Sequence, residues 1–153
     1  MNTIEFKKIT LKADLKHNAE SRSFYDLIVD GKSLFEQFID ADSDMAGHFG
    51  FYNDVKLNLK VIDEFQLKSK SELKSGQSMI FVCRDCGDIG CGAITAKIDE
   101  TDNKIIWSNY KWENDYEESY ESDFIDFPSL EFDKVEYINA LETVRKNCLQ
   151  QSI

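Results

Sequence analysis

The sequence predicts an α+β fold: a single domain (residues 1–153) with an antiparallel β-sheet, a C-terminal helix packed on one face, and a short helix in the N-terminal half. Three observations support this. Several stretches alternate apolar and polar residues, as half-buried strands do. Turn signals separate consecutive stretches, as in antiparallel hairpins. The last stretch has apolar residues at helical spacing, and 153 residues suffice for one hydrophobic core.

The N-terminal half is predicted to supply two strands and a short helix. Residues 7–15 alternate apolar and polar side chains, which predicts a half-buried strand. Residues 24–29 are predicted as a second strand, which ends at an Asp-Gly turn signal. Ser33, followed three residues later by Glu36, has the spacing of a capping box at the start of a short helix.

Residues 55–65 fit two patterns. Val55 and every second residue after it up to Val61 are apolar, as in a strand, whereas Ile62 and Phe65 break that alternation. We favour a strand that ends near Ile62.

The second half predicts a three-stranded meander followed by a helix. The predicted strands are residues 79–83, 92–98 and 104–111. A helix is predicted over 134–149, with Asp133 as N-cap and Glu136 completing a capping box. Its predicted apolar face consists of Val135, Ile138, Leu141, Val144 and Leu149.

The composition is strongly acidic, with 29 Asp and Glu against 18 Lys and Arg and a net charge of −11. Most of the acidic excess lies in the second half of the chain. Such a surface repels nucleic acid and anionic membranes and attracts basic proteins. The N-terminus lacks the apolar core of a signal peptide, so we expect a cytoplasmic protein with reduced thiols.

Three of the four cysteines lie in the stretch FVCRDCGDIGCGAI, at Cys83, Cys86 and Cys91. Their spacing begins like a zinc knuckle, but the next ligand position is Ala96, so zinc would need Cys148 or His48 as a distant fourth ligand. A redox pair would need a helix N-terminus after the first two thiols.

We favour a third interpretation of this stretch, in which it forms a tight corner between two strands. Gly87, Gly90 and Gly92 would supply positive φ angles, and the cysteines would be small buried fillers. This interpretation predicts no metal and no cofactor, with zinc as the main alternative.

No catalytic motif is present. The two histidines, His17 and His48, lie in polar or loop contexts, and the sequence has no nucleophile elbow, metalloprotease motif or P-loop. Carboxylates are so abundant that no pair stands out as an acid and base. We therefore expect a protein that is not an enzyme.

Residues 107–127, the acidic aromatic segment, interleave aromatic and acidic side chains. Trp107, Phe124 and Phe127 are expected in the core. Tyr116 and Tyr120, with acids on either side, suit a protein interface, where such side chains provide much of the contact energy and nearby carboxylates orient a basic partner. The alternative is a solvated edge that serves only solubility. The predicted partner-binding residues are Trp112, Asp115, Tyr116, Glu117, Glu118, Tyr120, Glu121 and Asp123.

Residues 79–141 resemble a group of uncharacterised bacterial proteins that share a C-G-x-x-G-C turn, a W-S-x-aromatic strand and a final F-D-x-x-x-Y-x-x-A-L helix. The resemblance implies a shared fold and carries no settled activity. In its small acidic design, the chain also resembles immunity proteins of contact-dependent growth inhibition and other polymorphic toxin systems. The first resemblance is carried by Cys86, Gly87, Gly90, Cys91, Trp107, Ser108, Phe132, Asp133, Tyr137 and Leu141.

The leading hypothesis is an immunity-type protein that neutralises a basic bacterial toxin domain, such as a nuclease, by blocking its active site or substrate channel. The alternatives are a zinc-binding or structural module of a cytosolic assembly, and an enzyme that uses scattered carboxylates. We expect a basic protein partner, with no binding to nucleic acid or membrane.

Overall fold

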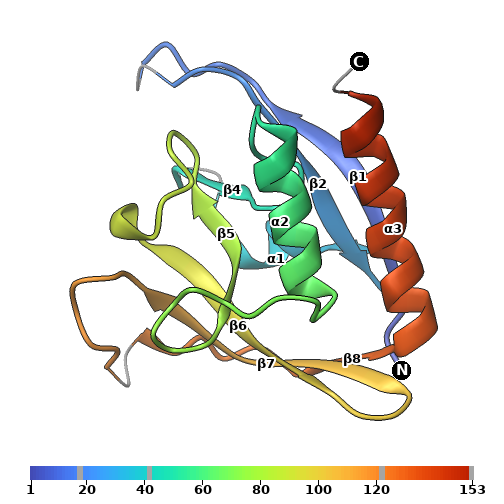
Figure 1. The fold of residues 1–153 in the computed structure, drawn as a ribbon. Coiled ribbons are helices and arrows are strands. Elements are labelled where there is room, and N and C mark those ends of the chain that lie inside the picture. Colours follow the sequence, from blue (N-terminus) through green and yellow to red (C-terminus); the bar gives the residue numbers. More distant parts are fainter. Residues whose placement is uncertain (17–18, 41–42, 121–122, 152–153) are drawn as a thin grey trace.

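The computed structural model describes residues 1–16, 19–40, 43–120 and 123–151, and its elements confirm the α+β class (Figure 1). In chain order they are β1 (Ile4–Leu11), β2 (Arg22–Val29), β3 (Lys32–Ser33), α1 (Leu34–Phe38), β4 (Met45–Gly47), α2 (Val55–Phe65), β5 (Ser78–Cys83), the 3₁₀ turn η1 (Ile89–Cys91), β6 (Ala93–Glu100), β7 (Lys104–Glu113), β8 (Leu130–Asp133) and α3 (Lys134–Gln150).

The strands form two antiparallel sheets, of order β1-β2-β3 and β4-β5-β6-β7-β8. All five predicted strands are present, but the first two belong to one sheet and the other three to the second. Backbone contacts link the sheets. Asn2 bridges to Phe132 of β8, and the Tyr25 N–H of β2 donates to the Phe49 carbonyl just after β4 (2.8 Å). The larger hydrophobic cluster and a smaller one both draw side chains from the two sheets.

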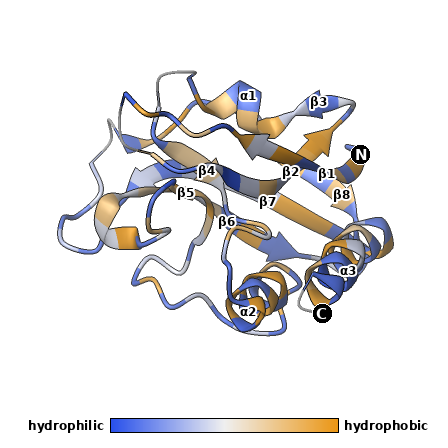
Figure 2. Ribbon diagram, turned by 90° about the horizontal axis from the view of Figure 1, so that it is seen from above, coloured by the Kyte–Doolittle hydropathy of each residue, from blue (hydrophilic) through white to orange (hydrophobic). Residues whose placement is uncertain are grey.

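Helices α2 and α3 lie side by side on one side of the larger sheet, and Trp107 of β7 is fully buried beneath them (Figure 2). Its indole contacts the rings of Phe65 in α2, Phe132 in β8 and Tyr137 in α3. The indole N–H donates to the Tyr137 hydroxyl (3.2 Å), which donates to the Phe65 carbonyl (2.7 Å). Burial raises the pKa of Tyr137, so this hydroxyl keeps its proton.

The strand predicted within residues 55–65 is wrong, because these residues form α2. Asp54 is the N-cap, and its carboxylate accepts the Lys56 N–H (2.9 Å). The buried side chains Asn58, Val61, Ile62 and Phe65 have helical spacing. Ile62 and Phe65, which broke the strand pattern, are fully buried and contribute to the helix face that meets the core.

Each predicted capping box is present in its first bond, from the backbone N–H of the glutamate to the N-cap side chain. The Ser33 hydroxyl accepts the Glu36 N–H at the start of α1 (3.1 Å), and the Asp133 carboxylate accepts the Glu136 N–H at the start of α3 (3.0 Å). These bonds satisfy backbone donors that the first turn of a helix leaves unpaired.

Two predicted apolar faces are partly wrong. Strand β1 ends at Leu11, and Leu15, expected to share its buried face, is 93% exposed. In α3, Val135 is 66% exposed and Leu149 also faces outward, because the helix turns Tyr137 and Cys148 toward the core instead.

Among the helices in the described part of the chain, none has the length and apolar run that a membrane span requires.

We predict that Tyr137→Phe destabilises the protein by about 2 kcal/mol, because it leaves the Trp107 N–H and the Phe65 carbonyl buried without their shared partner. Tyr116→Phe is the matched control, since that ring is 70% exposed and the same atom is removed. Urea unfolding of the two variants checks this. Equal midpoints would show that the buried hydroxyl contributes nothing.

Candidate functional site

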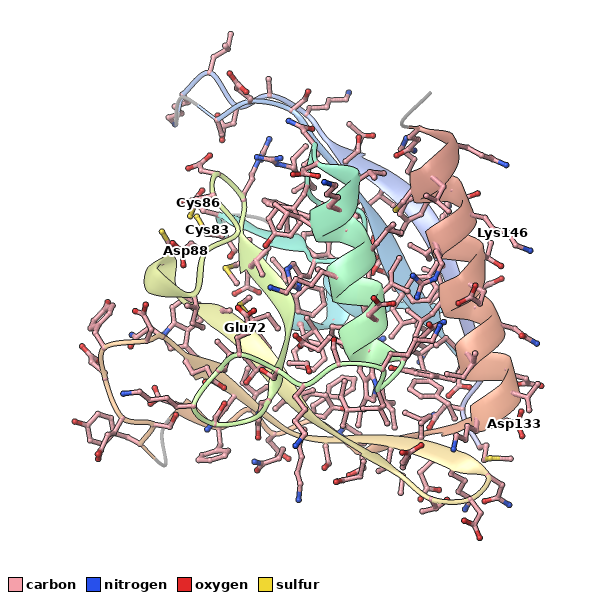
Figure 3. All side chains as sticks on the ribbon, in the orientation of Figure 1. Glu72, Cys83, Cys86, Asp88, Asp133 and Lys146 are labelled. Atoms are coloured by element: carbon pink, nitrogen blue, oxygen red, sulfur yellow. The ribbon has the colours of Figure 1, made fainter. Side chains whose placement is uncertain are left out.

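Residues 83–92, the cysteine corner, connect β5 to β6 and bring three thiols together. Cys83 is the last residue of β5, Cys86 lies in the following turn, and Cys91 ends η1. Their Sγ atoms all lie within 4.8 Å of one another, and those of Cys86 and Cys91 are 3.2 Å apart. All are free thiols. Cys83 and Cys86 are labelled in Figure 3, with Asp88 beside them at the end of β5.

The backbone of the corner turns twice to bring the thiols together. After Cys83 the chain reverses, and the Gly87 N–H donates to the Cys83 carbonyl (2.9 Å) with Gly87 at φ 68°. A Cβ at Gly87 would lie 2.7 Å from the Phe51 ring, so only glycine fits there. The Asp88 carboxylate then caps η1 by accepting the Gly90 N–H (3.2 Å), which returns Cys91 to the other thiols.

The interpretation of the cysteines as buried fillers is wrong. Cys86 and Cys91 are exposed and Cys83 is half-buried. The prediction of positive φ angles is confirmed at Gly87 and Gly92 and is wrong at Gly90. The corner is a tight connection between strands, as predicted, but its sulfurs face solvent.

The thiols perturb one another. Burial alone would raise the pKa of Cys83, but hydrogen bonds from the Cys86 and Asp85 backbone N–H groups to its sulfur bring it below the ordinary value. Hydrogen bonding to Cys86 and Cys83, followed by their charge, raises the pKa of Cys91 to about 12. Cys83 is therefore easier to deprotonate than Cys91.

Neither distant residue considered as a fourth zinc ligand reaches the corner. Cys148 is buried in α3. His48 is also buried, and its Nδ1 lies 2.8 Å from the Met79 carbonyl and its Nε2 3.0 Å from the Tyr52 hydroxyl. Because a carbonyl can only accept, the proton of the neutral imidazole lies on Nδ1. The Tyr52 hydroxyl has one proton, which either His48 Nε2 or the Gly87 carbonyl (3.2 Å) can accept, so Tyr52 lies between His48 and the corner.

Two arginines attach the corner to the ends of β1 and β2. Arg22 donates to the backbone carbonyls of Arg84 (3.0 Å) and Asp85 (3.2 Å), and its guanidinium stacks 4.2 Å from the centre of the Phe51 ring. Arg84 in turn donates to the carbonyls of Lys12 and Glu20. The first half of the corner is therefore held rigidly.

The acidic aromatic segment divides between β7 and the loop residues 114–120 and 123–129, the acidic loop. Glu113 anchors its first end: the carboxylate is buried and accepts from the hydroxyls of Thr95 (2.5 Å) and Ser75 (2.9 Å). At the second end, the Ile125 N–H donates to the Tyr110 carbonyl (2.9 Å), and the Phe127 ring packs against that of Tyr110. The loop is thus fixed at both ends.

The tip of the acidic loop presents its aromatic rings to solvent. Tyr116 is 70% exposed and Tyr120 is 65% exposed. Two polar side chains shape the backbone there. Asn114 accepts the Glu117 N–H (2.9 Å), and Asp123 accepts the Tyr120 N–H (2.8 Å). Local hydrogen bonds therefore hold the turns at the tip of the loop. Neither tyrosine ring is needed to pack these turns against the core, and both rings face solvent.

Most of the predicted partner-binding residues lie on this exposed surface. Trp112, Asp115, Tyr116, Glu117, Glu118 and Tyr120 are exposed, Asp123 is half-buried, and Glu121 lies outside the described residues. Trp107 is in the core, as predicted, and Phe127 is half-buried against Phe38. The core prediction for Phe124 is wrong. This ring is 45% exposed and lies near the Lys111 ammonium group (5.6 Å).

The corner lies against the end of β7 and near the start of the acidic loop, at one end of the molecule (Figure 1). The Trp112 ring lies on the backbone of Gly92, so close that a Cβ there would be 2.0 Å from it. An Asp115 carboxylate oxygen lies 3.9 Å from the corresponding position on Gly90. Sequence reasoning treated the two stretches separately and missed this contact, as it missed the anchoring role of Glu113.

A separate groove of about 570 Å³ lies between β1 and α3, away from both features. Its walls include Phe6 and Tyr25 on the strand side and Glu136, Asn139 and Val144 on the helix side. It is open and contains none of the predicted site residues.

Comparisons with family models, with curated proteins and with solved structures find no match for the chain.

We predict that His48 makes stability depend on pH. Burial lowers its pKa to about 4 from 6.5, so between these values the unfolded chain binds a proton that the folded chain does not. Stability from this group is present above pH 6.5 and is lost as the pH falls toward 4. Between pH 7 and pH 4.5, the wild type should lose about 2 kcal/mol more than His48→Asn, which keeps a donor for Met79. Denaturant unfolding at both pH values measures this, and equal losses would contradict it.

Proposed function

We propose that this chain is an immunity-type protein that binds a basic bacterial toxin domain, such as a nuclease, and blocks its active site or substrate channel with the acidic loop. The observation that carries the proposal is the exposure of Tyr116 and Tyr120, with Glu117 and Glu118 between them also exposed. A folded chain gains nothing in its own core from rings so placed, whereas interfaces are enriched in aromatics.

The charge around these rings indicates the kind of partner. After Lys111 the sequence has no Lys or Arg until Lys134, so the loop presents carboxylates without a compensating cation of its own sequence. Toxins that act on nucleic acid need a positive site to bind phosphate. A carboxylate-rich loop can occupy such a site and steer the approach of the toxin.

The anchoring of the loop also supports binding. Fixing both ends, at Glu113 and at Ile125, reduces the conformational entropy that the loop would lose when a partner orders it. Trp112, seated on Gly92, extends the aromatic surface toward the cysteine corner. Within the predicted set, Asp123 shapes the loop, because its carboxylate accepts the Tyr120 N–H.

The first test is genetic and biochemical. The proposal requires a toxin domain encoded beside the gene for this chain, and co-expression of the chain should protect cells from it. A neighbourhood of metabolic genes, or a purified pair that does not associate, would contradict the proposal.

We predict that the combined change Glu117→Lys, Glu118→Lys and Glu121→Lys slows association with the toxin by about tenfold at low ionic strength, and by less as salt screens the charges. Its melting temperature should barely change, since the described members of this set are exposed. Stopped-flow mixing across a salt series measures the rate. The control is Asp99→Lys with Asp102→Lys, which reverses two charges at the turn between β6 and β7, at the end of β7 away from the acidic loop. This variant should leave the association rate nearly unchanged.

We predict that truncating Tyr116 or Tyr120 to Ala changes the dissociation rate of the complex. Loss of a buried contact at the interface should speed dissociation by about 30-fold, equivalent to about 2 kcal/mol, with little change in the association rate. If all of these variants fold and protect cells fully, the acidic loop is only a solvated edge and the interface lies elsewhere.

A further inference from the structure

We propose that Cys83, Cys86 and Cys91 bind one Zn²⁺ ion through their sulfurs, with a fourth coordination position open to solvent. The proposal goes beyond the binding function above and does not depend on it. It replaces the prediction of a metal-free corner, which assumed that the cysteines were buried fillers, whereas two of the three are exposed.

The spacing of the sulfurs suits a single ion. Thiolates arranged tetrahedrally about zinc at about 2.3 Å lie about 3.8 Å from one another. In the cysteine corner the three Sγ atoms lie within 4.8 Å of each other, and the shortest separation is 3.2 Å. The sulfur–sulfur distance that zinc requires lies between the shortest observed distance and this upper limit. Side-chain adjustments of about 1 Å would therefore place all three sulfurs around one ion.

The backbone of the corner supplies a donor to one of the sulfurs. The Asp88 N–H donates to the sulfur of Cys86 (3.4 Å). Such contacts orient thiolate ligands and offset their charge in metal sites. The turn at Gly87 positions Cys83 and Cys86 before any metal binds.

A disulfide between Cys86 and Cys91 is the competing arrangement, because this pair is the closest. It would use two sulfurs and leave the third, Cys83, without a role. A zinc ion accounts for all three. Iron–sulfur clusters are most often held by four cysteines, whereas a single zinc ion binds three protein ligands and water in open sites.

The fourth position is assigned to water. Among the described His, Cys, Asp and Glu residues, no fourth group lies within the same spacing as the three sulfurs. The Asp88 carboxylate is close but accepts the Gly90 N–H. The exposure of Cys86 and Cys91 gives solvent access, and the carboxylates of Asp88 and Asp115 near Gly90 favour a cation there.

Trp112 provides a local reporter. Its ring lies on Gly92, the residue after Cys91, so an ion held by Cys91 changes the surroundings of this indole. The other tryptophan, Trp107, is fully buried among aromatic rings from other elements. A fluorescence change on metal addition that Trp112→Phe abolishes therefore locates the ion at the corner.

The test uses the full chain, reduced and stripped of metal with a chelator, to which Zn²⁺ alone or Co²⁺ alone is added. Elemental analysis should find one zinc per chain. Cobalt should give the sulfur-to-metal charge-transfer absorption and the intense visible bands of a tetrahedral thiolate site, and Zn²⁺ should displace it. A folded, reduced chain that binds neither ion overturns the proposal.

Variants separate this site from adventitious binding. Cys86→Ser and Cys91→Ser should each weaken metal binding by at least about 100-fold. Mutation of residues that only hydrogen-bond to metal ligands already lowers metal affinity by up to about that factor. Both residues are exposed, so the variants should fold, which circular dichroism verifies. Cys148→Ala, in α3, is the control and should leave one zinc per chain. Binding that survives Cys91→Ser, or that Cys148→Ala removes, would contradict the assignment.

Discussion

The hydroxyl of Tyr137 is the contact on which the arrangement of the larger sheet and its two long helices depends. It accepts the indole N–H of Trp107 in β7 and donates to the carbonyl at Phe65, where α2 ends. One buried group thus satisfies two others from different elements, and each would be costly to bury alone. Because β7 is flanked by β6 and β8, fixing it under α2 and α3 fixes the strand that continues to Glu113 and the acidic loop.

The far end of that strand has a different character. There the apolar core gives way to a buried polar group, Glu113, which two hydroxyls satisfy. Next to it, Trp112 of β7 packs on Gly92 of the cysteine corner, and the acidic loop follows. The acidic loop is fixed at both ends and exposed at its tip, and this arrangement suits binding to another protein. The fixed ends limit the conformational entropy that the loop loses on binding, and the exposed rings supply contact area. A zinc ion at the corner would stiffen the surface next to the aromatic rings.

Much of the fold could be predicted from local pattern: strands β1, β2, β5, β6 and β7, the C-terminal helix, and the caps at Ser33 and Asp133. The short strands β3, β4 and β8 were not predicted. Helix α2 could not, because alternate apolar residues from Val55 to Val61 imitate a strand, and only tertiary packing shows that Phe65 belongs to the same face. The burial of Glu113 could not be predicted from the sequence pattern either. Near Asn109 (φ 56°) the pairing of β7 with β6 shifts register, so the buried positions of β7 do not follow simple alternation. The exposed rings of Tyr116 and Tyr120 were predictable because acids flank them, whereas the meeting of three sulfurs depends on the turn at η1.

The central claim is that the acidic loop is the contact surface, and amide hydrogen exchange of the chain with and without the toxin domain tests it most directly. The account predicts slower exchange in residues 112–120 and 123–125 on binding, with α3 unchanged. Slower exchange confined to the groove between β1 and α3, with the loop unaffected, would contradict it.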